Sequence, residues 1–394
     1  MSNQTTNNSS NSTTTSYSTN STETSSIYSA CTENLTPWTT ILTLTLLYFI
    51  AILWFCKHGK NVCHPTPDSI FPYIERLRFL RRALDDFLVD DINIELTDIK
   101  LGQGAVGFVF KGYVVAKSQT RFRQKVFAAV KMSYPMPQKS IGLLEEAARM
   151  ARLNHPNIVK LIAVSKLSFT VFRPMLAMEW LAGGKKRGKG ASESLCQRHS
   201  PHFTSDCTRP QVCLKNFFDQ KNSKLRYLHE NRDIQGNDFT HGDVAARNIL
   251  LNERNLATCI AKLGDFGLPI DFGPRLPIPW LPPEIVCSLD QQNTKHRPES
   301  DVWMFGVLCW ECATLGAEPH YQRTFEEICF AFEQPDHGLP LPRSCPQEYA
   351  DFVYDCLSEQ HRRPRFAGPT DVYSSAIFRL THIQDLYKHS RGKI

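Results

Sequence analysis

The stretch His241-Gly242-Asp243-Val244-Ala245-Ala246-Arg247-Asn248 decides the fold of this 394-residue chain. Asp265-Phe266-Gly267 follows 17 residues after Asn248. Six further motifs accompany this pair in a fixed order: Gly102-Gln103-Gly104-Ala105-Val106-Gly107-Phe108-Val109, Val126-Phe127-Ala128-Ala129-Val130-Lys131, Glu146 with Ala147 and Met150, Pro282-Pro283-Glu284, Ser300-Asp301-Val302-Trp303-Met304-Phe305-Gly306, and Arg363-Pro364-Arg365-Phe366. Any one of them can arise by chance, but eight in order at workable spacings indicate a single fold.

The glycine-rich motif predicts a hairpin that covers phosphate groups. Glycines let backbone N–H groups approach phosphate oxygens, because no Cβ lies in the way. A dinucleotide-binding turn should lead into a helix, whereas residues 109–115 form a β-favouring run. We therefore expect two strands joined by a short loop.

Together the eight motifs resemble the protein kinase family over residues 95–388. The resemblance implies an α+β fold with a small β-rich N-lobe, a large helical C-lobe, and ATP bound between them. It also implies that Asp243 accepts the proton of the substrate hydroxyl, and that Asn248 and Asp265 bind Mg²⁺. The residues implied to contact ATP are Gly102, Gln103, Gly104, Ala105, Val106, Gly107, Val109, Lys131, Met178, Glu179 and Leu181.

By the same resemblance, Lys131 orients the α- and β-phosphates of ATP, and a carboxylate on the next helix holds the flexible lysine chain. Glu146 and Glu145 both lie in a helical stretch after Lys131. We favour Glu146, because Glu146-Ala147-x-x-Met150 resembles the E-A-x-x-M of tyrosine kinases. The alternative for each residue is a surface ion pair worth less than about 1 kcal/mol.

Several motifs resemble tyrosine kinases in particular. Ala245-Ala246-Arg247 resembles the tyrosine-kinase form of the catalytic loop, which makes Arg247 a further catalytic candidate. Leu276-Pro277-Ile278-x-Trp280 resembles L-P-[IV]-[KR]-W, and Met178-Glu179-Trp180-Leu181 resembles the hinge. The family analogy also pairs Glu284 with Arg363 and predicts that Asp301 braces the catalytic loop.

The chain before the kinase-like region has two unlike parts. In residues 1–37, 27 side chains are Ser, Thr, Asn or Gln, so this tail is predicted to be disordered. It holds six N-x-[ST] triplets, which predict glycosylation if the tail is extracellular. Residues 38–56 carry no charge. Nineteen helical residues reach about 28 Å, close to a hydrocarbon core of about 30 Å, so this segment is predicted to span a membrane.

The charges flanking this segment predict its orientation. No Lys or Arg precedes Lys57, and Lys60 follows soon after. The positive-inside rule then places the tail outside the plasma membrane and residues 57–394 in the cytosol. The whole resembles a receptor-type tyrosine kinase with a very short ectodomain. A homodimer through the span or through Cys31 is an option that the sequence leaves open.

Residues 57–94 are predicted to be a cytosolic juxtamembrane segment, and residues 389–394 a short tail. An amphipathic helix is predicted from apolar residues three and four positions apart, namely Ile74, Leu77, Leu80, Leu84 and Leu88. Interleaved arginines could attract anionic lipid, at about 1 kcal/mol for each charge. An ordinary solvated helix face explains them equally well.

The sequence departs from the family pattern at four places. Gly242 replaces the arginine that in the family often binds a phosphorylated activation loop. The 20 residues from Asp265 to Glu284 include no Tyr, Ser or Thr. Neither a phosphorylated residue in this segment nor the arginine that would bind it is therefore expected. Pro279 replaces a basic residue before Trp280. Residues 184–240 are irregular, and either a true insertion or a misassembled reading frame could produce them.

Two cysteine patterns invite other readings. Cys196, His199, His202, Cys207 and Cys213 match no common zinc finger, so a disordered insert is favoured. Cys309 and Cys312 form a C-x-x-C, but they follow a buried-helix pattern and are predicted to be core thiols.

The predicted function is transfer of the γ-phosphoryl group of ATP to tyrosine hydroxyls of protein substrates by a membrane-anchored kinase. A membrane-bound pseudokinase scaffold is the alternative, favoured by the short activation segment and Pro279. A serine/threonine kinase is a third option, which Ala245-Ala246-Arg247 disfavours. The net charge of +6 is mild and gives no reason to expect nucleic acid as a partner.

Overall fold

The computed structural model describes residues 36–58, 67–104, 106–116, 124–170, 173–183, 224–233, 236–253, 255, 258–267, 276–289, 296–367 and 375–391. The chain divides into two compact units, Met1–Pro72 and Tyr73–Ile394. Most of the predicted tail, residue Ala105, the cysteine- and histidine-bearing stretch 196–213 and loop residues 268–275 lie outside the described residues.

The first unit contains helix α2, Thr36–His58, which includes the whole segment predicted to span a membrane. The hydroxyls of Thr43 and Thr45 donate to the carbonyls of Thr39 and Ile41, both at 2.9 Å. The two polar side chains are thus satisfied along the helix itself. Within the described residues, no helix meets the combined length and apolar character needed to cross a membrane.

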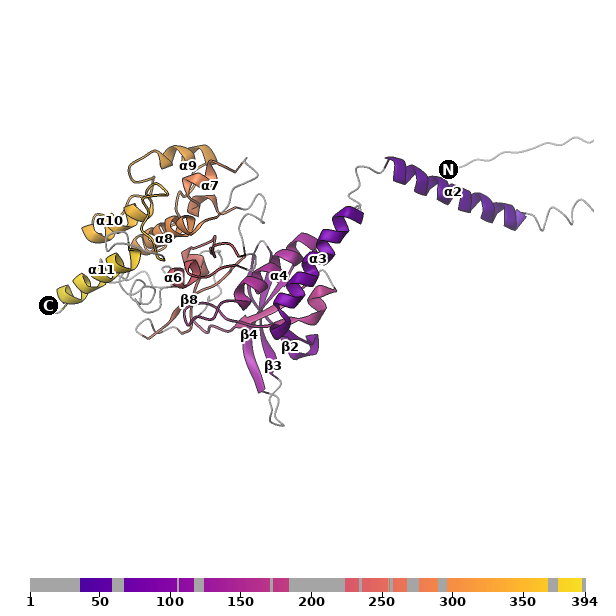
Figure 1. The fold of residues 1–394 in the computed structure, drawn as a ribbon, viewed down its shortest axis with the longest axis horizontal. Helices are drawn as coiled ribbons and strands as arrows, with labels where there is room; N and C mark the ends of the chain where they lie inside the picture. The colour runs from indigo at the N-terminus through magenta and orange to yellow at the C-terminus, as the bar shows by residue number, and fades with distance from the viewer. Residues whose placement is uncertain are drawn as a thin grey trace, which may run out of the picture. The chain divides into compact units, whose positions relative to one another are not determined.

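The second unit opens with a six-stranded sheet in the order β1-β5-β6-β4-β3-β2 (Figure 1). Its strands are β1 Leu88–Val89, β2 Ile94–Gln103, β3 Gly107–Ala116, β4 Gln124–Ser133, β5 Leu161–Ser165 and β6 Met175–Glu179. All neighbours are antiparallel except β1 and β5. β2 and β3 pair antiparallel around the glycine-rich loop, as the predicted hairpin requires.

One face of this sheet buries small and β-branched side chains at alternate positions. On β4, Ala128 and Val130 are fully buried, and they pack with Val114, Ala163 and Ala177 of the neighbouring strands. Lys131 follows Val130 and therefore points to the opposite face. Strand periodicity thus turns the lysine away from this small core.

Helix α4, Pro137–Ala151, contacts β4, β5 and β6. It begins at Pro137. Proline suits the first helical turn, because the backbone nitrogens there have no partner within the helix and the N–H group that proline lacks is not missed. Leu143, Leu144 and Ala147 are buried on one face, and Glu146 is buried with them. The amphipathic pattern thereby carries a carboxylate into the interior.

Helix α3, Pro67–Ala83, contains the first part of the predicted amphipathic helix, but the prediction extended too far: Leu84 follows the helix end and Leu88 lies in β1. From Tyr73 onward the helix belongs to the second unit, and Figure 1 shows it beside α4. Leu80 and the following Leu84 are fully buried in the same core as Leu143 and Leu144. The Arg76 guanidinium contacts Glu145 Oε1 at 2.7 Å. This face of α3 is covered by protein, and Ile74 stays exposed.

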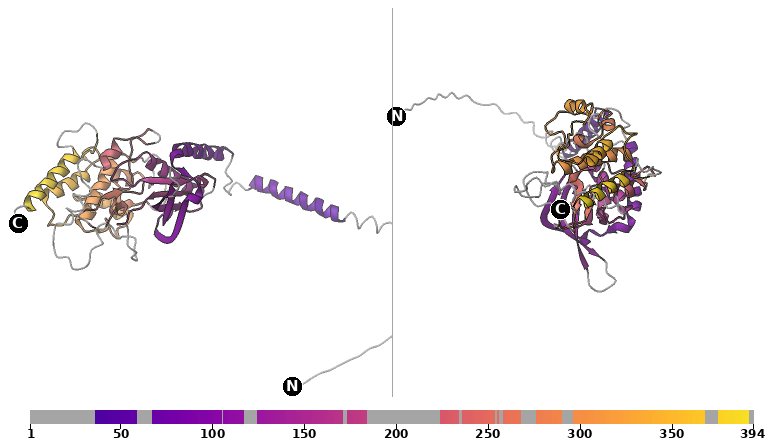
Figure 2. Two further views of the ribbon diagram at one scale, coloured as in Figure 1. Left: turned by 90° about the horizontal axis from the view of Figure 1, so that it is seen from below. Right: turned by 90° about the vertical axis from the view of Figure 1, so that its left-hand side faces the viewer.

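The remainder is mostly helical, as both views of Figure 2 show. Its helices and strands, within the described residues, are α6 Lys224–His229, β7 Ile249–Leu251, β8 Ala261–Leu263, α7 Pro283–Val286, α8 Pro298–Ala313, α9 Phe325–Phe332, α10 Gln347–Cys356 and α11 Ala376–Arg391. The described part of the second unit also contains the 3-10 turns Asp85–Phe87, Asp91–Asn93, Lys166–Phe169, Ala246–Asn248 and Ile278–Trp280.

Helix α8 forms the centre of this helical part. Nearly all its side chains are buried, including the predicted core thiols Cys309 and Cys312, neither of which forms a disulfide. Arg363 pairs with Glu284 through two contacts of 2.6 and 2.8 Å, as the family analogy predicted. The two-lobed architecture expected from the motifs is therefore present.

Candidate active site

A cavity of about 220 Å³ collects most of the residues that the sequence singled out. Its predicted members are Gly102, Val109, Lys131, Glu146, Met178, Glu179, Leu181, Arg247, Asn248 and Asp265. They come from the sheet, from α4 and from the loops around β7 and β8. Segments up to 163 positions apart in the sequence (Gly102 to Asp265) therefore share one cavity.

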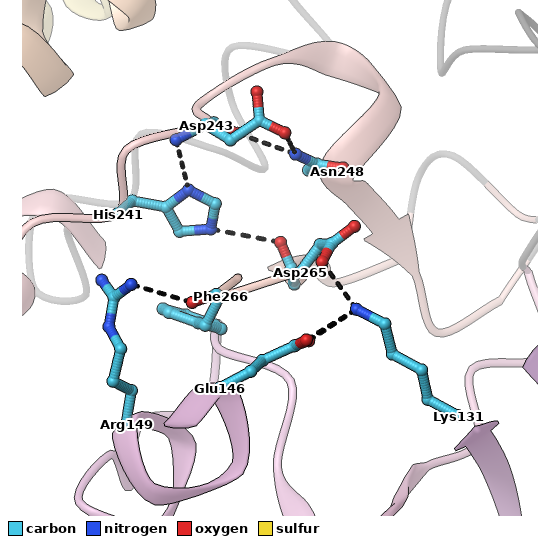
Figure 3. A network of polar contacts seen from close by, with 9 residues as sticks. Lys131, Glu146, Arg149, His241, Asp243, Asn248, Asp265 and Phe266 are labelled. Carbon is cyan, nitrogen blue, oxygen red and sulfur yellow. Dashed lines mark hydrogen bonds and ion pairs between the residues drawn. The ribbon is translucent and has the colours of Figure 1, made fainter. Parts of the chain in front are cut away.

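Lys131 lies at the centre of a buried ionic network (Figure 3). Its Nζ contacts both carboxylate oxygens of Glu146, at 2.8 and 2.7 Å, and Asp265 Oδ1 at 2.8 Å. Burial alone would lower the pKa of Lys131, but the two carboxylates raise it above its usual value. The lysine is therefore a fixed cation next to the cavity.

The two carboxylates differ in their surroundings. Glu146 is 1% exposed, and burial raises its pKa despite the neighbouring lysine. The Asp265 side chain is half exposed. Burial opposes its ionisation, but Lys131 outweighs this and holds the pKa of Asp265 below its usual value. Asp265 thus offers an ionised oxygen donor to the cavity.

The backbone at Asp265 is unusual, because its φ of 63° lies in the left-handed region. Such strain in a non-glycine residue persists only where the surroundings impose it. Here the Lys131 contact at 2.8 Å and the buried ring of the next residue, Phe266, fix the turn. The turn of the predicted D-F-G motif therefore directs a carboxylate toward Lys131.

The catalytic-loop candidates gather around Asp243. Asn248 Nδ2 donates to the carbonyl and to Oδ2 of Asp243, at 2.8 and 2.7 Å, and Arg247 Nη2 donates to Oδ1. Asp243 does not line the cavity itself, but its partners Arg247 and Asn248 do. The loop therefore presents a carboxylate next to the cavity edge.

Asp301, in the first turn of α8, binds the backbone of the catalytic loop. It accepts from the backbone N–H groups of His241 and Gly242, at 2.7 and 2.8 Å, and lies 3.2 Å from His229 Nε2. Gly242 has a φ of 82°, which glycine adopts without strain. This geometry matches the predicted bracing role of Asp301.

His241 is fully buried, and burial lowers its pKa, so the ring is neutral near pH 7. Its Nδ1 accepts from the Asp243 N–H at 3.1 Å, and Nε2 lies 3.1 Å from the Gly264 carbonyl. The ring therefore links the catalytic loop to the D-F-G turn as one proton donor and one acceptor.

Asn248 and Asp265 have the chemistry that Mg²⁺ requires. Asn248 uses its amide nitrogen for Asp243, which leaves Oδ1 as an oxygen ligand, and both side chains line the same cavity. In the described part of the chain no group of three metal-ligating acidic, His or Cys side chains exists. Mg²⁺ usually takes one or two protein oxygens together with phosphates and water, so two donors suit it.

The glycines of the glycine-rich loop differ in whether the structure leaves room for a side chain, which the motif alone does not reveal. A Cβ on Gly107 would collide with the backbone carbonyl of Met132 on β4, whereas Cβ atoms on Gly102 and Gly104 would meet nothing within 4 Å. Gln103 bonds Lys100 and Tyr134 through its side chain. Gln103, Gly104, Val106 and Gly107 do not line the cavity in the part of the chain described.

The hinge candidates border the cavity beside β4 and β6. Met178 is paired with Ala129, so the strand register places it across from the segment that carries Lys131. The Glu179 carboxylate contacts Lys262 Nζ twice at 2.8 Å. The Glu179 carboxylate is therefore already paired with a lysine of the same chain.

Sequence reasoning missed six lining residues: Leu101, Ala129, Val159, Trp180, Leu250 and Gly264. Two of these had a usable signal. Ala129 lies two positions before Lys131 on a strand, so alternation places both side chains on one face. Trp180 lies within the hinge motif Met178-Glu179-Trp180-Leu181. Val159 gave no local signal, because only the folded chain brings it to the cavity.

The comparisons with known proteins agree with this geometry. A family model described as "Protein tyrosine and serine/threonine kinase" matches residues 96–370. The chain is 45% identical to Protein nipi-4 of Caenorhabditis elegans over 360 residues, covering 89% of this chain and 88% of the relative.

More distant relatives include receptors. The chain is 26% identical to Ephrin type-B receptor 3 of Xenopus laevis over 362 residues and 28% identical to Ephrin type-B receptor 4 of Homo sapiens over 330 residues. These matches include 83% and 79% of this chain, but only 33% and 30% of the length of the two receptors. The family match, the relative similar over nearly its full length and the assembled cavity lead to one conclusion: the chain belongs to the protein tyrosine and serine/threonine kinase family.

Proposed function

We propose that the chain is an active, membrane-anchored tyrosine kinase that transfers the γ-phosphoryl group of ATP to tyrosine hydroxyls of protein substrates. The observation that carries this proposal is the network joining Lys131, Glu146 and Asp265 beside Asp243 and Asn248. Phosphoryl transfer uses all five side chains, and each of them contacts at least one of the others.

Each residue has a role that follows from its charge and place. Lys131 binds phosphate oxygens as a fixed cation, and Glu146 holds its side chain. Mg²⁺ bound at Asn248 and Asp265 would neutralise charge on the phosphates. Asp243 takes the proton of the tyrosine hydroxyl while the tyrosine oxygen bonds to the γ-phosphorus; the bond from that phosphorus to the bridging oxygen breaks, and ADP leaves.

Tyrosine as the acceptor is supported by the loop that carries Asp243. Ala245 is buried and supplies no charge, where serine/threonine kinases usually carry a lysine. The Arg247 guanidinium lies 4.1 Å above the ring of Trp280, which fixes the arginine between the catalytic loop and the segment preceding α7.

A pseudokinase scaffold remains the second candidate because of one observation. Both Asp243 carboxylate oxygens are engaged, one by Arg247 and the other by Asn248. Each oxygen keeps a second lone pair, so a substrate hydroxyl has to share an oxygen with a contact inside the loop. A scaffold would keep this arrangement without turnover.

The membrane-anchored part of the proposal rests on sequence. Residues 38–56 carry no charge, lie within α2 and are followed by Lys57 and Lys60. This pattern supports a single-pass plasma-membrane protein with an extracellular, glycosylated N-terminus. Glycosidase treatment should lower its apparent mass; an N-terminus that carries no glycan and stays protected in intact cells contradicts this topology.

The test of specificity uses the full chain in detergent with ATP and Mg²⁺. Two peptides that differ only in a tyrosine or a serine acceptor are compared. The proposal expects phosphate on the tyrosine peptide. Equal labelling of both peptides would exclude tyrosine specificity, and failure to bind ATP with Mg²⁺ in a thermal-shift assay would favour the scaffold.

A further inference from the structure

Arg149 on α4 is a buried arginine that none of the motifs explains. It lies three residues after Glu146, one helical turn away, and is 7% exposed. Its Nη1 donates to the Phe266 carbonyl at 2.9 Å, and its Nη2 donates to the Thr240 carbonyl. The guanidinium also lies 5.0 Å from the ring centre of Phe239. Figure 3 shows it on the side of the network opposite Lys131.

The two carbonyl acceptors belong to different parts of the site. Phe266 directly follows Asp265, and Thr240 directly precedes His241. The helix that carries Arg149 also carries Glu146. The Arg149 side chain therefore joins three parts of the site: the helix whose Glu146 contacts Lys131, the turn that contains Asp265 and the start of the loop that contains Asp243.

The contact needs the shape of arginine. A guanidinium keeps its charge in proteins and presents donors in a rigid planar fork, so it can serve two carbonyls at once. A lysine ammonium is a compact point charge with a different geometry. If α4 moved away or the Phe266 backbone turned over, these bonds would break and leave a buried cation without these acceptors. Such a rearrangement is strongly disfavoured.

The chain also lacks the usual means of fixing this arrangement from outside. Position 242 is glycine, and residues 265–284 contain no hydroxyl that a kinase could phosphorylate. An internal tie at Arg149 supplies a hold that does not depend on such a phosphate.

We propose that Arg149 is a positioning residue that holds α4, the D-F-G turn and the catalytic loop in the phosphotransfer-competent arrangement without activation-loop phosphorylation. The inference rests on the proposed function, because it assigns a role in the same reaction. Arg149 does not line the cavity and acts through Glu146, Asp265 and Asp243.

The test compares Arg149→Met and Arg149→Lys with Arg152→Met in the full chain. Arg152 is the matched control, because it ends the same helix and is exposed. Losing two charge-assisted bonds should lower kcat by about tenfold or more in Arg149→Met, with the peptide KM within about twofold of the wild-type value. Arg149→Lys should stay at least about threefold below wild type, because one ammonium does not replace the fork. Wild-type kcat in both Arg149 variants would overturn the proposal.

A second readout keeps this test separate from the proposed function. Hydrogen exchange of the amides in α4 and in residues 264–267 should be about tenfold faster in Arg149→Met and unchanged in Arg152→Met. If Arg149→Met does not fold, Arg149→Lys gives the same comparison. Unchanged exchange in the Arg149 variants overturns the positioning role even if the wild type is active. Faster exchange in Arg149→Met, together with a wild type that transfers no phosphate, supports the tie and contradicts only the proposed catalytic activity.

Discussion

Replacing Glu146 with Gln tests the ionic network at its most buried point. Glu146 is 1% exposed and accepts two bonds from Lys131, at 2.8 and 2.7 Å. Gln removes the negative charge and turns an NH₂ group toward an ammonium, so Lys131 keeps only Asp265 as an anionic partner. A hydrogen bond to a charged group contributes about 1.5–3 kcal/mol. At about 1.4 kcal/mol for each tenfold change, kcat/KM for ATP should fall about 10- to 100-fold.

Glu145→Gln is the matched control for this prediction. Glu145 precedes Glu146 and contacts Arg76, and its side chain is 25% exposed. The assay measures initial rates of peptide phosphorylation over a range of ATP concentrations for the wild type and both variants. Glu145→Gln should stay within about threefold of wild type, since partly exposed pairs contribute about 1 kcal/mol or less. A Glu146→Gln enzyme within twofold of wild type, or a larger loss in Glu145→Gln, would refute the reasoning.

Three further predictions concern stability. Glu284→Gln should lower the free energy of unfolding by roughly 3 kcal/mol in urea titrations, because it leaves the buried Arg363 charge without its carboxylate; an unchanged midpoint would contradict this. Gly107→Ala should destabilise the protein by about 1–3 kcal/mol, since its Cβ meets the β4 backbone, whereas Gly104→Ala should be tolerated; equal melting temperatures would show that the loop adapts. Burial raises the pKa of Glu311 to about 7, so the folded state binds more protons than the unfolded state between about pH 4.5 and 7, and stability falls as pH rises through that window. Glu311→Gln should therefore gain roughly 3 kcal/mol relative to wild type between pH 4.5 and pH 8, and a pH-independent difference would refute the assignment.

The motifs predicted much of the site because each combines a local structure with a required side chain. Glu146 rather than Glu145 contacts Lys131, and helix periodicity explains the difference: Glu146 shares the buried face with Leu143 and Ala147, while Glu145 lies toward α3. The pairing of Glu284 with Arg363 was accessible only through the family analogy.

Contacts between distant segments were beyond the sequence. Arg149 reads as an ordinary charged helix residue, yet its acceptors are backbone carbonyls 91 and 117 positions away. Carbonyls have no sequence signature, so no pattern could indicate this tie. Similarly, the sequence predicts that the arginines of α3, Arg76 among them, contact either lipid or solvent. Arg76 instead contacts Glu145, which lies 69 positions later on α4.

The role of Gly107 was also hidden. The motif attributes its glycines to phosphate binding, whereas the close approach of β4 accounts for Gly107. Such a requirement depends on the register of Gly107 opposite Ser133, which the sequence does not specify.

Phosphotransfer by the full chain, with and without the Asp243 carboxylate, tests the central claim most directly. Wild type and Asp243→Asn are incubated with radiolabelled ATP, Mg²⁺ and a tyrosine peptide, and the phosphate on tyrosine is counted. Because a positioned general base contributes about 10²- to 10⁴-fold, the variant should lose at least about 100-fold in rate while still binding ATP. Wild-type protein that transfers no phosphate, or an Asp243→Asn variant with the wild-type rate, would contradict the account.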